Sequence, residues 1–215
     1  NEQIRSIIDV INQKGQHAIV YGERGVGKTS LVNVLSAFLG MPAVIAPRVN
    51  CDSTDTYETV WKKAFEQIEL SRRQPGMGFM ANDQVNTFSS RELLGDDISP
   101  DSVRRALTIL SSHASAIFIV DEFDRLAQEP RRVFADTIKS LSDHAVGATV
   151  ILVGVADSVS ELIAEHQSVE RALVQVQMPR MSGNEIEQII KTGAHKLGMS
   201  ASNQSLRQIA KLAQG

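Results

Sequence analysis

The sequence is poor in cysteine and aromatic residues, and it has no long apolar run. Cys51 is the only cysteine among 215 residues, which excludes an internal disulfide and a thiolate metal site. We interpret Cys51 as a small buried residue at a strand end. No segment approaches the roughly 18 consecutive apolar residues of a membrane-spanning helix. The sequence therefore predicts a soluble, cytoplasmic protein without a membrane partner.

A surplus of either charge is also missing. The formal net charge is −3, from 25 acidic and 22 basic residues. This balance gives no electrostatic case for tight nucleic-acid binding by the whole domain, although a local basic patch would not show in the sum. With 42% hydrophobic residues, the chain is expected to bury one substantial core. It begins with Asn1 rather than methionine, and we expect it to be part of a longer protein.

Apolar spacing predicts strands that alternate with helices. The expected helices cover residues 4–11, 31–38, 56–70, 100–110 and 131–144. The expected strands cover residues 17–21, 43–49, 116–120, 148–155 and 174–176. Pro47 suggests that the second strand lies at a sheet edge or ends early. This alternation predicts an α/β fold, a parallel sheet sandwiched by helices, with ligands at the carboxyl ends of the strands.

Two segments depart from this alternation. Between Ser71 and Ile98 the periodicity disappears, and we expect a long loop, either a plain or disordered insertion or a segment that contacts a partner. Beyond Pro179 the pattern is helical only, and Ser182 to Glu185 form a capping box. We therefore expect an α/β domain over residues 1–179 and a partial helical domain over 180–215.

The strongest motif is a phosphate-binding loop. Residues Gly22 to Thr29 read G-x-x-x-x-G-K-[ST] and follow a strand-like run. The backbone N–H groups of such a loop converge on phosphate oxygens, Lys28 reaches the β/γ-phosphates, and Thr29 offers its hydroxyl to Mg²⁺. A glycine-rich turn without a ligand is the alternative. The expected nucleotide contacts are Gly22, Gly25, Val26, Gly27, Lys28, Thr29 and Ser30.

Two acids end the most apolar strand. Asp121 is expected to lie near Thr29 and hold Mg²⁺ through water, and Glu122 to polarise a water for attack on the γ-phosphate. Acids at this position can otherwise be simple polar caps. A GTPase would carry an N/T-K-x-D guanine motif, which this sequence lacks, so ATP is the expected nucleotide.

Two further residues are candidates by position. Asp157 follows the next strand, where it either senses the γ-phosphate or caps a helix. Arg171 lies after a short helix and before the last strand. It either projects to a neighbouring subunit's γ-phosphate as an arginine finger or forms a salt bridge within the chain.

Taken together, the loop, the Asp121-Glu122 pair, Asp157, Arg171 and the helical tail resemble the AAA+ ATPases over nearly the whole chain. The sequences of the motifs are similar to those of bacterial and archaeal members related to origin-recognition and transposition-helper proteins. The resemblance implies an AAA+-like P-loop domain followed by the start of a small helical lid. It also implies that Asp157 occupies the first sensor position and that Arg171 acts in trans. That sensor is more often Asn, Ser or Thr, so Asp157 departs from the pattern.

Two functions follow as hypotheses. In the first, the protein binds ATP and Mg²⁺, hydrolyses ATP to ADP, and couples this to homo-oligomer assembly or conformational work, on DNA or on a protein partner. The catalytic residues would be Glu122, Lys28, Arg171 and Asp157. In the second, the protein is a nucleotide-gated scaffold that hydrolyses ATP slowly and mainly recruits partners.

Overall fold

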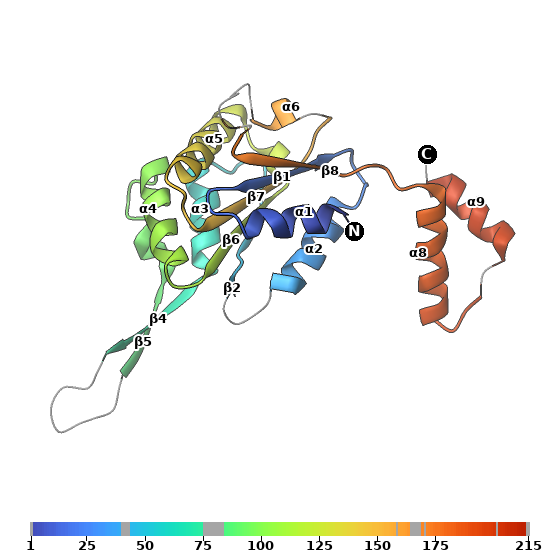
Figure 1. Ribbon diagram of the computed structural model, residues 1–215, viewed down its shortest axis with the longest axis horizontal. Coiled ribbons are helices and arrows are strands. Elements are labelled where there is room, and N and C mark those ends of the chain that lie inside the picture. Colours follow the sequence, from blue (N-terminus) through green and yellow to red (C-terminus); the bar gives the residue numbers. More distant parts are fainter. Residues whose placement is uncertain are drawn as a thin grey trace.

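A parallel sheet forms the centre of the molecule (Figure 1). The computed structural model describes residues 2–39, 44–74, 84–157, 159–163, 169, 171–200 and 202–213. The strands lie in the order β2-β6-β7-β1-β8, and β3 also pairs with β6. In that order they span Val44–Ile45, Ser115–Asp121, Ala148–Val155, His17–Gly22 and Leu173–Gln177, and β3 spans Arg48–Asn50. The predicted α/β fold with a parallel sheet is confirmed.

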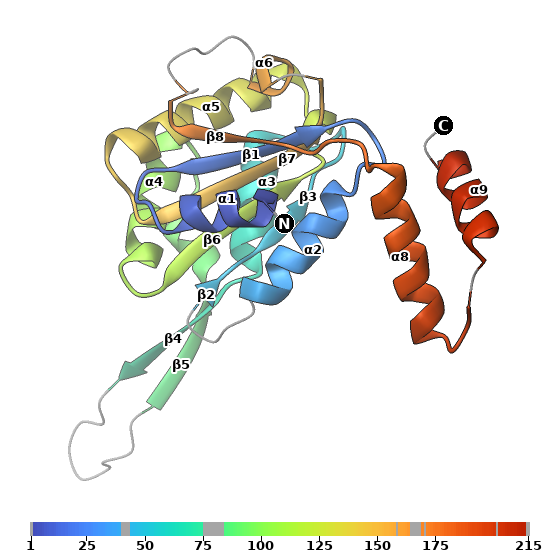
Figure 2. The same cartoon turned by 45° about the vertical axis from the view of Figure 1, so that its right-hand side comes forward.

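Helices cover both faces of this sheet (Figure 2). One face packs against α1 (Glu2–Ile11) and α2 (Lys28–Leu39). The other packs against α3 (Tyr57–Glu66), α4 (Pro100–Ser111), α5 (Gln128–Asp143) and α6 (Val159–Ile163). Along β1, Val20 contacts the first layer and Ile19 the second. Because both faces are buried, the central strands are continuous apolar runs in the sequence.

The strand expected over 43–49 is interrupted at Pro47. Val44–Ile45 and Arg48–Asn50 form separate short strands, β2 and β3, which both pair with β6. Proline has no N–H to donate, but the Pro47 carbonyl accepts a hydrogen bond from Ile119 N–H at 3.0 Å. The edge position of β2 agrees with the prediction. Ala43 lies outside the described residues.

The predictions between residues 56 and 98 were partly wrong. The helix expected to reach Leu70 ends at Glu66, and Glu69–Gln74 form strand β4. This strand pairs antiparallel with β5 (Gln84–Ser89), and the hairpin extends away from the sheet in Figure 1. A short 3₁₀ helix, η1 (Ser90–Leu93), follows. The strand sequences carry polar residues on both faces, so they lack the alternation that identifies a half-buried strand.

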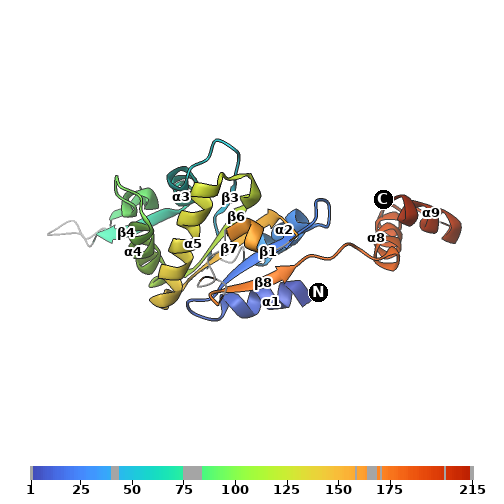
Figure 3. The ribbon, with the colours of Figure 1, turned by 90° about the horizontal axis from the view of Figure 1, so that it is seen from above.

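The last described segments are helical, as the sequence predicted. Ser182 begins α8 (Gly183–Lys196) with a capping box: its hydroxyl accepts from Glu185 N–H, and the Glu185 carboxylate accepts from Ser182 N–H. α9 (Asn203–Ala213) packs against α8, and Figure 3 shows this pair beyond the end of the sheet. None of the helices in the described ranges is long and apolar enough to span a membrane.

His17, at the start of β1, provides a test of the buried sheet. Its side chain is fully buried, and Nδ1 accepts a hydrogen bond from Val150 N–H at 3.0 Å. Burial disfavours the charged ring and lowers the pKa of His17 from 6.5 to about 4. As the pH falls below 6.5, the unfolded chain therefore binds a proton that the folded chain does not accept until about pH 4.

We accordingly expect the free energy of unfolding to fall by about 2 kcal/mol between pH 7 and pH 5 through His17 alone. Urea unfolding at both pH values measures this loss. His17→Gln should flatten the pH dependence, whereas His113→Gln, at an exposed histidine, should retain it. An equal pH dependence in wild type and His17→Gln would contradict the assignment.

Candidate nucleotide-binding site

The phosphate-binding loop connects the end of β1 to the start of α2. Gly22 ends the strand, and a Cβ there would lie 2.5 Å from the Met178 carbonyl oxygen, so only glycine fits. Gly25 has a φ of 85°, in the left-handed region that glycine adopts without strain. The Gly27 carbonyl then accepts the first helical hydrogen bond of α2 from Leu31 N–H at 2.9 Å. The loop therefore presents its N–H groups at a helix N-terminus, where anions bind.

Lys28 lies within this loop rather than in open solvent. Its ammonium donates to the carbonyl oxygens of Gly22 at 2.8 Å and Glu23 at 2.6 Å. Burial lowers the pKa of Lys28, and the negative charges of Asp124 and Asp121 partly offset this shift. The lysine therefore stands between the loop and the acids that follow β6. Thr29 and Ser30 follow it in the first turn of α2, and both are exposed.

Asp121, the last residue of β6, is a buried carboxylate. Its Oδ1 accepts from Glu122 N–H at 2.9 Å, and its Oδ2 accepts from the Arg48 guanidinium at 2.6 Å. Arg48 also donates to Asn33 Oδ1 at 2.6 Å, and Asn33 lies one turn after Thr29 on α2. This network places Asp121 beside the α2 face that carries Thr29. Sequence reasoning missed Arg48 and Asn33, because neither belongs to a motif.

The hydroxyl of Thr29 and the carboxylate of Asp121 fit a Mg²⁺ site. Mg²⁺ prefers hard oxygen ligands and usually keeps several waters and substrate phosphates, so one carboxylate and one hydroxyl suffice. The guanidinium beside Asp121 indicates that the carboxylate faces a position where a cation is favoured. Within the described ranges, no group of three or more His, Cys, Asp or Glu side chains forms a cluster for a metal ion.

Glu122 has an unusual backbone conformation next to Asp121. Its φ is 56° and its ψ is 35°, a left-handed geometry that a non-glycine residue adopts at a cost of about 1 kcal/mol or more. The strained turn leads into η2 (Phe123–Arg125) and directs the carboxylate to the surface. There it accepts from Arg125 Nη1 at 3.0 Å. The predicted base thus lies next to Asp121 but is held by a neighbouring arginine.

Asp124 is a further site residue, which belongs to the Asp121-to-Asp124 motif but had no role in the sequence prediction. Its Oδ1 accepts from the N–H of Val155, the last residue of β7, at 2.8 Å. The charge of Asp124 also acts on Lys28. This carboxylate therefore connects the ends of β6 and β7 to the phosphate loop. The signal was the acid three residues after Asp121.

Asp157 lies at the same edge of the sheet as the loop. It lines a cavity of about 150 Å³ together with Gly22, Val26 and Arg180. Its backbone N–H donates to Glu161 at 3.2 Å, within the turn that enters α6. Arg180, in the segment between β8 and α8, donates from Nε to Glu23 at 2.7 Å. Sequence reasoning missed Arg180, which connects the segment before α8 to the phosphate loop.

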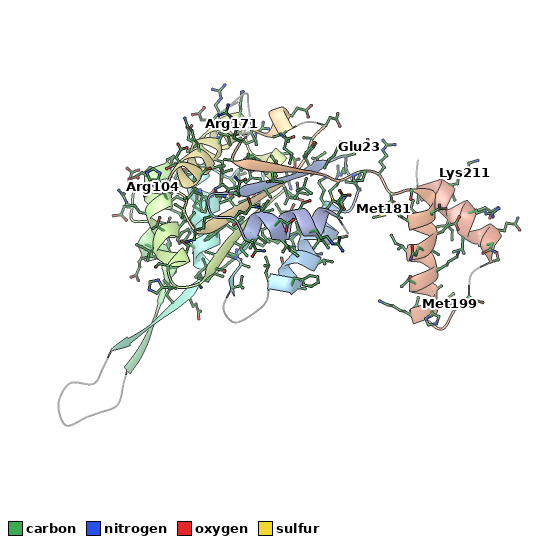
Figure 4. All side chains as sticks on the ribbon, viewed as in Figure 1. Glu23, Arg104, Arg171, Met181, Met199 and Lys211 are labelled. Carbon is green, nitrogen blue, oxygen red and sulfur yellow. The ribbon has the colours of Figure 1, made fainter. Side chains whose placement is uncertain are left out.

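Arg171 lies near the amino-terminal ends of the strands, opposite the end of the sheet that carries the phosphate loop. The carbonyl of Ala172 accepts from His17 N–H at 2.9 Å, which places Arg171 near the start of β1. The length of β1 separates this position from Gly22 by about 17 Å. In Figure 4, the exposed Arg171 lies at one end of β8 and Glu23 near the other. The structure therefore does not bring Arg171 to the phosphate loop of its own chain.

The comparisons with known proteins agree with this geometry. Solved structures with the same fold include a Walker-type ATPase of Pyrococcus abyssi, at 14% identity and a TM-score of 0.64, covering 99% of this chain and 62% of that protein. The ORC2 protein of Aeropyrum pernix, in ADPNP and ADP complexes, matches at 17% identity and a TM-score of 0.57 over 90% of this chain and 51% of that one.

The ORC1 protein of the same organism, solved with DNA, matches at 17% identity and a TM-score of 0.52 over 91% of this chain and 49% of that one. The chain thus spans about half to three fifths of the length of these proteins. No curated protein matches it closely enough to be a relative. The AAA domain family matches residues 11–163, most of the chain. These residues contain the loop, Asp121 and Glu122, and the chain belongs to the AAA domain family of P-loop ATPases.

Proposed function

We propose that the protein binds ATP with Mg²⁺, hydrolyses it to ADP and phosphate, and couples the nucleotide state to conformational work or oligomer assembly. One observation carries this proposal: the loop after β1 and the acids after β6 meet at the same sheet edge, with Lys28 between them. Family membership and the ADPNP and ADP complexes of the ORC2 neighbour support nucleotide binding.

In the proposed site, the N–H groups of the loop and the Lys28 ammonium bind the phosphates. Lys28 exchanges its bonds with the Gly22 and Glu23 carbonyls for phosphate oxygens. Thr29 and Asp121 hold Mg²⁺, which supplies charge neutralisation at the phosphates. Burial lowers the pKa of Lys28, and the negative charges of Asp124 and Asp121 partly offset this shift in favour of the charged ammonium. These residues together favour a bound, charged triphosphate.

Glu122 is the proposed general base. Its carboxylate is exposed and adjacent to Asp121, where it can orient a water and accept its proton. Its release from Arg125 is part of reaching the active arrangement. Asp157 lines the cavity beside the loop and is proposed as a polar sensor there. Helices α8 and α9 are proposed as a lid, which Arg180 connects to the loop through Glu23.

Arg171 is proposed as a finger that acts on a neighbouring subunit. Its exposure and its distance from the phosphate loop of its own chain are consistent with action in trans. A homo-oligomer with nucleotide at subunit interfaces follows from this role. DNA is one proposed partner of such an assembly, since the ORC1 neighbour was solved in complex with it.

A nucleotide-gated scaffold with slow hydrolysis is the second candidate. The ion pair between Glu122 and Arg125 favours it, because a carboxylate held by a guanidinium is not free to orient a water. ATP binding without turnover in the assembled protein, together with partner recruitment, would support this candidate over the first.

Lys28→Ala is expected to weaken ATP binding by about tenfold to a hundredfold, because it removes charge-assisted hydrogen bonds to the phosphates. Equilibrium binding of a fluorescent ATP analogue measures the change. Lys139→Ala, on α5, is the matched control and should bind normally. Unchanged binding in Lys28→Ala would contradict the nucleotide site itself.

Glu122→Gln is expected to lower kcat by about a hundredfold or more while ATP affinity changes by less than about threefold, because an amide cannot accept the proton of water. Phosphate release under steady state and equilibrium binding separate the two quantities. Glu129→Gln, at an exposed acid in the first turn of α5, should keep wild-type turnover. Normal turnover in Glu122→Gln would assign the base to another group.

Arg171→Ala is expected to abolish turnover in the assembled oligomer without affecting ATP binding. Mixing it with Glu122→Gln should restore activity at about a quarter of the interfaces, since an intact base then meets an intact arginine from a neighbour. Arg105→Ala, at an exposed arginine of α4, is the control. A mixture no more active than its components would show that Arg171 does not complete a neighbour's site.

A further inference from the structure

Arg48 connects three elements at the metal side of the site. It begins β3, in which Asn50 lies opposite Asp121 of β6 in the parallel register. Its Nη2 donates to Asp121 Oδ2 at 2.6 Å, and its Nη1 donates to Asn33 Oδ1 at 2.6 Å. The guanidinium therefore bridges the carboxylate at the end of β6 and the α2 face that carries Thr29.

The backbone of Arg48 is held in place by the side chain of Gln67. Its N–H donates to Gln67 Oε1 at 3.1 Å, and its carbonyl accepts from Gln67 Nε2 at 2.8 Å. Gln67 is the C-cap residue of α3, which packs against β3. Both partners of the ion pair are largely buried, with side-chain exposures of 24% for Arg48 and 6% for Asp121. The ion pair between Arg48 and Asp121 is therefore part of the packed structure and not an exposed surface contact.

Burial strengthens the attraction between Arg48 and Asp121. Two charges of opposite sign attract far more strongly where solvent is excluded than at an exposed surface. Within the described residues, the buried Nε of Arg48 has no hydrogen-bond partner, so Asp121 and Asn33 provide its stabilisation. Removing the guanidinium would leave Asp121 with a buried charge and a free oxygen.

The same carboxylate is the proposed Mg²⁺ ligand. Glu122 N–H occupies Oδ1 and Arg48 occupies Oδ2, so neither oxygen is without a donor. A divalent cation at Asp121 must either displace the guanidinium or sit beside a like charge, and both cost free energy. Arg48 donates to Asn33 on α2, near the proposed metal position, whereas Lys28 donates to the carbonyl oxygens of the loop.

We propose that Arg48 is a built-in competitor for the metal at Asp121 and sets the affinity of the site for divalent cations. The inference rests on the proposed function, since it assigns Asp121 to Mg²⁺. Asn33 is a positioning residue that holds the competing guanidinium in place. The site then binds Mg²⁺ more weakly than the same site would without Arg48.

Arg48→Met keeps an unbranched apolar stem at this position but removes the guanidinium and its charge. In a Mg²⁺ titration of fluorescent ATP analogue binding, this variant should reach its midpoint at about tenfold lower Mg²⁺ than wild type. Asn33→Ala, at an exposed position, should shift the midpoint in the same direction by about threefold. Arg105→Met, at an exposed arginine paired with Asp101 on α4, is the matched control and should not shift it.

A second experiment uses Mn²⁺ alone, without nucleotide, and measures the concentration of free Mn²⁺ by electron paramagnetic resonance. Arg48→Met should bind Mn²⁺ more tightly than wild type, and Asp121→Asn should abolish the difference. If wild type binds no nucleotide at any Mg²⁺ concentration, the proposed function fails, while this experiment still tests Arg48. Thermal unfolding checks that each variant is folded. If Arg48→Met does not fold, Asn33→Ala still tests the proposal.

Equal midpoints for wild type, Arg48→Met and Asn33→Ala in both experiments would overturn the proposal. A higher Mg²⁺ requirement in Arg48→Met would also overturn it, because Arg48 would then act on the phosphates rather than compete for Asp121. A gain that persists in the Asp121→Asn background would place the competition at another carboxylate.

Discussion

The parallel pairing of β1, β7 and β6 is the constraint on which the rest of the site depends. Gly22 lies opposite Val155, and Val120, directly before Asp121, lies opposite Leu152. The three strands therefore end at one edge, where the phosphate loop, Asp121 and Asp124 meet. A shift of one residue in any strand would turn its apolar side chains to the wrong face, so core packing on both sides holds the register and with it the site.

Charge balance is the second constraint at this edge. Lys28 and Arg48 are the partly buried cations there, and Asp121 and Asp124 are acids close to them. Each cation has at least two oxygen partners, because a partly buried charge without partners is costly. Phosphate and metal binding then become exchanges of partners. The proposed roles of Lys28 and Arg48 both follow from this exchange.

The hairpin at Glu69–Ser89 shows where sequence patterns lose their information. Buried strands such as β6 are apolar runs and were predicted closely, and the capping box at Ser182 marked a helix start. The strands of the hairpin pair with each other outside the core, so neither face is selected to be apolar. Only their mutual backbone hydrogen bonds identify them. Such nonlocal pairing leaves no periodic trace in the sequence.

The sequence by itself determined the α/β class, the phosphate loop, the Asp121-Glu122 pair and the helical tail, because each depends on residues adjacent along the chain. Only the tertiary structure decided that Arg48 and Asn33 contact Asp121's side of the site, that Arg125 holds Glu122, and that Arg171 lies near the amino-terminal ends of the strands. Apart from the local Arg125–Glu122 pair, those contacts join elements far apart in sequence. Their partners are chosen by how the strands and helices pack, which no local motif encodes.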